Sequence, residues 1–89
     1  MSDRVARIRS ALEAAFAPTV LEIEDQSAQH RGHAGAKDGK GHFRVAIRAS
    51  AFRGKSPLQR HRLVYDALAA LLETDIHALS IDARADDAA

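Results

Sequence analysis

The sequence contains no cysteine among its 89 residues. This absence excludes disulfide bonds, a thiol nucleophile and any metal site built from the chain's own thiolates. The chain also lacks an apolar run near the ~20 residues that a membrane span needs, and its N-terminus shows no signal-peptide pattern. We therefore expect no membrane association and a cytoplasmic protein. With 46% hydrophobic and 28% charged residues, the composition predicts a single globular domain over residues 1–89.

The motifs of common enzyme classes are missing as well. No G-x-S-x-G sequence is present, which argues against a serine hydrolase. Gly54-Lys55-Ser56 matches the end of a phosphate-binding loop, but the full pattern needs glycine where the chain has Ala49. The segment Gly32–Gly35 has the G-x-x-G form of nucleic-acid-binding KH domains, yet it lies between two predicted strands rather than two helices. We therefore do not expect an enzyme acting alone.

Hydrophobic periodicity predicts the element order α-β-β-α-β. A first helix begins after Ser2 or Asp3 and ends before Pro18. Strands follow over residues 19–25 and 42–49, and the second is the cleaner one, with inward positions alternating with outward ones. The inward set is Phe43, Val45 and Ile47, and the outward set is His42, Arg44, Ala46 and Arg48. Between these strands, residues 26–41 hold four of the five glycines, and a loop of this length is usually functional or mobile.

Residues 56–81 form the central hydrophobic unit, predicted as one helix, a short polar turn and a strand. Ser56 provides the N-cap and Pro57 takes the first helical position. His61 falls in the middle of a broad apolar arc, so we expect a buried core histidine rather than a ligand. That arc consists of Leu58, His61, Leu63, Val64, Tyr65, Ala67, Leu68, Leu71 and Leu72.

The last strand has a period of two, which places His77 with Leu79 and Ile81 on one side, half-buried at the edge of the sheet. Residues 83–89 are expected to be frayed. The helices would cover one face of a three-stranded sheet and leave the other face partly wet.

The charge is distributed unevenly along the chain although the net charge is only +1. Residues 31–62 carry nine Lys and Arg against one acid, and the remainder carries four against eleven. This asymmetry indicates a phosphate-rich or acidic partner, unless these residues only solvate one face of the sheet. Sequence-specific RNA binding is disfavoured, since Phe43 has inward parity and no outward aromatic is available for stacking. The candidate DNA contacts are Arg44, Arg48, Arg53 and Lys55.

Five histidines stand out in a chain without cysteine, because imidazole is the other common transition-metal ligand. His42 has outward parity and is expected to be structural or on the surface. A rigid strand histidine, His77, and a loop histidine, His30 or His33, could converge on one metal. Two imidazoles leave such a site incomplete, so a partner would supply the other ligands.

The chain resembles the BolA family over nearly its whole length. Five segments carry the resemblance, and they occur in the family's order: Leu21-Glu22-Ile23-Glu24-Asp25-Gln26-Ser27 followed by His30, then His42-Phe43-Arg44-Val45, Phe52-Arg53-Gly54, Arg60-His61-Arg62-Leu63-Val64-Tyr65 and Ile76-His77-Ala78-Leu79-Ser80-Ile81. Two departures are visible. Gln26 stands where the family usually has Glu, and the loop carries a second histidine, His33.

The resemblance implies an α+β fold of the class II KH-like type, with the order αββααβ and helices packed on one face of a three-stranded sheet. It implies that a [2Fe–2S] cluster is shared in a heterodimer with a monothiol (CGFS) glutaredoxin, whose cysteine and a glutathione supply thiolates. His77 and His30 would be this chain's ligands, with His33 as the alternative to His30. Without its partner, the chain would be a monomer that carries no cluster. The function implied for the family is in iron–sulfur cluster trafficking or iron homeostasis. Some family members are also described as DNA-binding transcription regulators, which makes weak DNA binding the alternative function.

Overall fold

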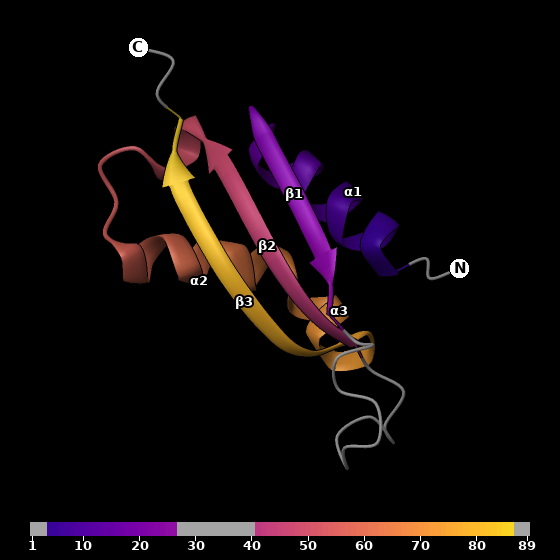
Figure 1. Ribbon diagram of the computed structural model, residues 1–89. Coiled ribbons are helices and arrows are strands. Elements are labelled where there is room, and N and C mark those ends of the chain that lie inside the picture. Colours follow the sequence, from indigo (N-terminus) through magenta and orange to yellow (C-terminus); the bar gives the residue numbers. More distant parts are fainter. Residues whose placement is uncertain (1–3, 27–40, 87–89) are drawn as a thin grey trace.

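The computed structural model describes residues 4–26 and 41–86 (Figure 1). Its elements follow the order αββααβ, with one short 3₁₀ turn after the second strand. They are α1 (Arg4–Phe16), β1 (Val20–Asp25), β2 (Gly41–Ala49), η3 (Ser50–Phe52), α2 (Pro57–Ala67), α3 (Ala69–Thr74) and β3 (Ile76–Ala85). This arrangement confirms the predicted α+β, class II KH-like fold. Each helix in these ranges is too short or too polar to cross a lipid bilayer.

The three strands form one mixed sheet in the order β1-β2-β3, with the helices on one face (Figure 1). β1 runs antiparallel to β2, and β3 runs parallel to β2. A parallel pair needs a crossover connection, which η3, α2 and α3 provide. β2 is the central strand, and its residues are alternately buried and more exposed, as predicted.

The core lies between the sheet and the helices. Nine large side chains are essentially inaccessible: Ile8, Leu12, Phe43, Val45, Ile47, Phe52, Val64, Leu68 and Ile76. The ring of Phe52 lies 5.0 Å from that of Phe16, centroid to centroid, which confirms its predicted role as the anchor of the β2–α2 connection. The start of α2 also agrees with the sequence. The Ser56 side chain accepts a hydrogen bond from the Gln59 N–H in a capping box, and Pro57 is the first helical residue.

The helix predicted as one element is divided at Leu68, where the backbone leaves helical geometry (φ −103°, ψ 10°). The Leu68 N–H is shared between the carbonyls of Val64 and Tyr65, at 3.1 and 3.2 Å, as is common where a helix ends. The prediction of a frayed tail is also wrong for residues 83–85, which belong to β3. Ala83 is in the core with 7% of its surface exposed.

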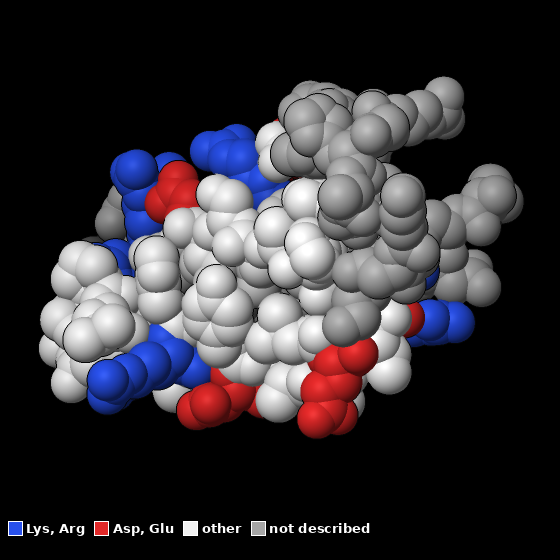
Figure 2. All heavy atoms as spheres, turned by 90° about the horizontal axis from the view of Figure 1, so that it is seen from below, with Lys and Arg blue, Asp and Glu red and all other residues white. Residues whose placement is uncertain are grey.

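The prediction that His61 is buried is wrong. His61 is exposed on α2, as are its neighbours along the same helix face, Leu58 and Tyr65. The buried stripe is narrower than predicted and centres on Val64 and Leu68, because in the part of the chain that the structure describes no further element covers this flank of α2. Figure 2, a view from below, shows uncharged side chains across the middle of the described surface and charged ones towards its rim.

Candidate functional site

A β-bulge at the start of β3 presents His77 to solvent. Gly41 is paired with Ile76, but the next residue of β2, His42, is paired with Ala78. His77 is therefore the extra residue of the bulge, which the register between β2 and β3 skips. Ile76 before it is buried at 2% exposure, whereas His77 is exposed. The predicted alternation that placed His77 on the side of Leu79, half-buried, is thus wrong at this residue, because the bulge interrupts the period of two.

The bulge brings His77 next to His42. The two imidazole rings are 5.1 Å apart, centroid to centroid, and are tilted by 51°. His42 has the outward parity that its strand predicted, and its side chain is half-buried. The proximity of the two rings was not predicted, because it depends on the register between β2 and β3. Of the histidines in the described ranges, these two lie side by side, whereas His61 is on α2.

Gln26 and Gly41, which flank the segment with the loop histidines, are hydrogen-bonded close to this histidine pair. The Gln26 N–H donates to the His42 carbonyl at 2.7 Å, and the Gly41 N–H donates to the Asp75 carbonyl at 3.0 Å. Residues 27–40, and with them His30 and His33, lie outside the described residues. The choice between His30 and His33 as a ligand therefore stays a prediction.

The chemistry available at this end of the sheet is that of two imidazoles beside an open surface. A hollow of about 210 Å³ adjoins His42 and is lined by Gln26, His42, Phe43, Ala78, Leu79 and Ser80. No group of three or more His, Asp or Glu side chains with metal-binding spacing occurs in residues 4–26 and 41–86. These residues alone would thus leave ligand positions on a metal to water or to a second molecule.

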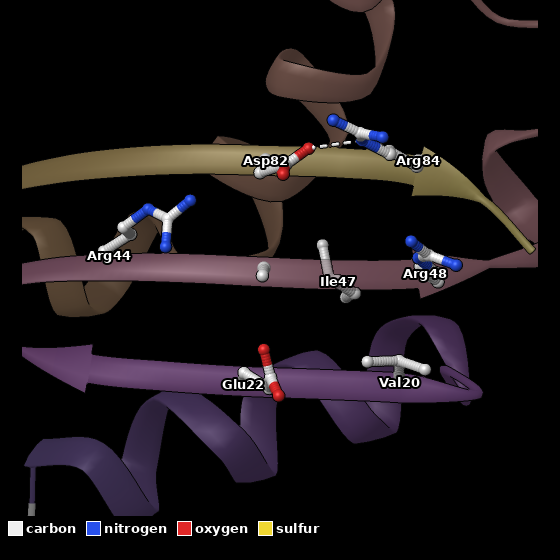
Figure 3. A pocket seen from close by; sticks show the side chains of 8 residues that line it. Val20, Glu22, Arg44, Ile47, Arg48, Asp82 and Arg84 are labelled. Carbon is white, nitrogen blue, oxygen red and sulfur yellow. Dashed lines mark hydrogen bonds and ion pairs between the residues drawn. The ribbon is translucent and has the colours of Figure 1, made fainter.

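The predicted DNA contacts lie in two separate places. Arg44 and Arg48 are exposed on the open face of the sheet, where Arg84 joins them around a hollow of about 340 Å³ (Figure 3). Arg53 and Lys55 are in the connection between η3 and α2. Arg53 is bound there by an ion pair to Asp86, at 2.5 Å.

The sequence reasoning missed Arg84 because it ended the last strand too early. Two acids interrupt the basic side chains of this hollow. Glu22 reaches in from β1 and Asp82 from β3, and the Arg84 Nε lies 2.9 Å from an Asp82 carboxylate oxygen (Figure 3). The open face is therefore mixed in charge rather than uniformly basic.

Comparison with known proteins identifies the family. The family model described as BolA-like protein matches residues 12–88. The chain belongs to the BolA-like family. This BolA-like chain is 52% identical over 79 residues to BolA-like protein 1 of Homo sapiens, covering 89% of the chain and 56% of that protein. It is 46% identical over 89 residues to SufE-like protein 1, chloroplastic/mitochondrial, of Arabidopsis thaliana, covering 94% of the chain but 24% of that protein.

Two further comparisons concern a bacterial relative and the fold. The DNA-binding transcriptional regulator BolA of Escherichia coli strain K12 is 41% identical over 75 residues, which cover 84% of the BolA-like chain and 69% of the relative. Among solved structures, the BolA domain of SufE1 from Arabidopsis thaliana superposes with a TM-score of 0.83 at 45% identity, covering 96% of the chain and 94% of that domain. The chain thus corresponds to a BolA domain and spans about half or less of the human and plant relatives' own length.

Proposed function

We propose that this BolA-like chain shares a [2Fe–2S] cluster with a monothiol (CGFS) glutaredoxin, as a non-catalytic adaptor in iron–sulfur cluster trafficking or iron homeostasis. The chain would contribute His77 and His30, with His33 as the alternative to His30. The glutaredoxin cysteine and a glutathione would contribute thiolates. A cytoplasmic location stays a prediction.

The observation that carries the proposal is the exposed His77 in its bulge, next to the point where residues 27–40 leave and rejoin the sheet. A ligand shared between two proteins has to be accessible to the second protein while its backbone stays fixed. His77 meets both conditions, because the residues on either side of the bulge are paired with β2. A loop histidine would add reach to this fixed position.

Imidazole suits such a shared site chemically. It ligates iron as a neutral group, and replacing thiolates by histidines raises the reduction potential of a [2Fe–2S] cluster, as in Rieske centres. The chain's own part is then to hold His77 in the bulge, to keep its ring accessible, and to leave the softer thiolate ligands to the partner.

The decisive experiment mixes the purified chain with a cluster-loaded monothiol glutaredoxin and records visible absorption and circular dichroism. We expect the wild-type chain to change both spectra and His77→Ala to abolish the change while its far-UV spectrum stays that of a folded protein, since an exposed imidazole contributes little packing. His61→Ala is the matched control, because His61 is also exposed but lies on α2. If His77→Ala changed the spectra of the glutaredoxin as the wild-type chain does, the proposal would be contradicted.

The same assay identifies the loop ligand. His30→Ala alone should alter the mixed spectrum and lower cluster stability, with His33→Ala nearly silent. If both single variants behave as wild type and only the double variant fails, the two histidines substitute for each other. A double variant with the wild-type spectrum would remove the loop from the ligand set.

DNA-binding regulation is the second candidate function. Arg44, Arg48 and Arg84 on the open face of the sheet favour it, and the printed name of the Escherichia coli relative describes a DNA-binding transcriptional regulator. Tight DNA binding is not expected, because the G-x-x-G motif with which KH domains clamp nucleic acid is missing from its usual place. The junction of α2 and α3, where KH domains carry G-x-x-G, contains no glycine in this chain.

A further inference from the structure

The distance between the His42 and His77 rings can be compared with that between two histidines in a zinc site, without reference to a loop histidine. In a tetrahedral zinc site each nitrogen lies ~2.0–2.1 Å from the metal, which puts the ring centroid ~3.2 Å from it and two such centroids ~5.2 Å apart. The observed separation of the His42 and His77 centroids is 5.1 Å. The separation of the two rings therefore matches that of two imidazoles on one tetrahedral ion, once the side chains turn a nitrogen of each ring towards a common point.

The backbones that carry these rings are fixed from several sides. The carbonyl of His42 accepts the Gln26 N–H, and Gly41 before it donates to Asp75. His77 lies between Ile76 and Ala78, both paired with β2. A metal ion would thus need side-chain rotation but no change in strand positions, which keeps the ordering cost of binding low.

The surroundings leave room for further ligands. His77 is exposed, and the hollow of about 210 Å³ beside His42 opens to solvent and is lined in part by the polar residues Gln26 and Ser80. Water can occupy the coordination positions that the two imidazoles leave. Nitrogen ligands with water suit borderline ions such as Zn²⁺ better than Mg²⁺ or Ca²⁺, which prefer oxygen.

We propose that His42 and His77 form a two-imidazole site that binds one divalent transition-metal ion, of the Zn²⁺ class, in the isolated chain. The site consists only of these two residues and water. It needs no glutaredoxin, no cluster and no loop histidine, and it shares only His77 with the function proposed above.

The test titrates Zn²⁺ into the whole chain, purified without a histidine tag, and follows the heat of binding together with the NMR signals of the imidazole rings. We expect one ion per chain and shifts confined to the rings of His42 and His77. His42→Phe keeps an aromatic ring but removes its nitrogens, and His77→Ala removes the other ligand. Each should weaken binding by about tenfold or more, since even partners outside the ligand shell contribute about 10–100-fold.

Two control variants separate this pair from the other histidines. His61→Ala and the double variant His30→Ala/His33→Ala should bind Zn²⁺ as the wild type does. The proposal is overturned if the wild type binds no Zn²⁺, if His42→Phe binds as tightly as wild type, or if only the loop double variant loses binding. The far-UV spectrum and melting curve of His42→Phe show whether it is folded, and His77→Ala tests the same pair from the other strand.

The outcome can be told apart from that of cluster sharing. His77 belongs to both proposed sites, whereas His42 belongs to the metal pair alone. Loss of Zn²⁺ binding in His42→Phe together with an unchanged spectrum in the glutaredoxin mixture would support both proposals. Failure of the wild-type chain to bind Zn²⁺ would remove the pair site and leave cluster sharing untouched.

Discussion

His61 and Val64 lie three residues apart on α2 in opposite environments, and this contrast gives a prediction at the scale of single residues. Val64 is fully buried against the sheet, and His61 is exposed. We expect Val64→Ala to lower the free energy of unfolding by about 2 kcal/mol, from lost burial and the cavity that remains. His61→Ala should change it by less than about 0.5 kcal/mol. Urea denaturation of both variants measures the difference, and a large effect of His61→Ala would show that its ring packs against the core.

The same contrast shows what a helical pattern can and cannot predict. Apolar residues at helical spacing correctly identified Val64 and Leu68 as core residues. They could not define the width of the buried stripe, because that width depends on what covers the flanks of the helix. Leu58 and Tyr65 are apolar or aromatic and still 62% and 40% exposed. The apolar residues around His61 in the sequence therefore predict its burial, although no element packs over its side chain in the described part of the chain.

Among the elements, the edge strand β3 is held along its outer side by two side chains of α2. The Arg60 Nη1 donates to the Ala83 carbonyl at 2.9 Å, and the Tyr65 hydroxyl donates to the Leu79 carbonyl at 3.4 Å. These contacts occupy carbonyls of a strand that no other strand covers within residues 4–26 and 41–86. They limit the edge-to-edge association to which an open strand edge is prone.

We predict that Arg60→Met loosens the C-terminal half of β3. It keeps an apolar stem of similar length but loses a charge-assisted hydrogen bond, at a cost of about 1–2 kcal/mol. Native-state hydrogen exchange should show faster exchange at Ala83–Ala85 than in the half of β3 near His77. Arg62→Met, at an exposed position of the same helix, is the control. Equal acceleration along the whole strand, or equal effects of both variants, would contradict this role of Arg60.

Local signals predicted most elements, and long-range pairing decided the rest. The alternation of β2 and the Ser56 cap follow from neighbouring residues and were predicted correctly. The bulge follows from how residues 41–42 pair with residues 76–78, far along the chain. Taken alone, the last strand places His77 in phase with Leu79. The sequence thus identified His77 as a candidate ligand but could not reveal its exposed position or its contact with His42.

For the molecule as a whole, the described part of the basic segment, residues 41–62, does not form one basic surface. Arg44 and Arg48 lie on the open face of the sheet, Arg53 is paired with Asp86 at 2.5 Å, and Arg60 is bound to a β3 carbonyl. Figure 2 likewise shows acidic side chains directly beside basic ones at several places on the face seen from below. Within residues 41–62, the count of basic residues along the chain therefore overstates the positive field that a phosphate backbone would meet.

From this distribution we predict DNA binding that is weak, independent of sequence and dependent on salt. Each neutralised phosphate contributes about −0.9 to the slope of log K against log salt, and a hollow with three arginines offers few such contacts. Arg44→Glu/Arg48→Glu should reduce binding to every duplex tested and flatten the salt dependence.

Glu22→Gln/Asp82→Asn should strengthen binding, because it removes the acids of the same hollow and releases Arg84 from its ion pair. Fluorescence anisotropy with duplexes of different sequence at several salt concentrations measures both effects. A tight complex at physiological salt that selects one sequence would place regulation ahead of cluster chemistry, since phosphate contacts alone cannot distinguish base sequences.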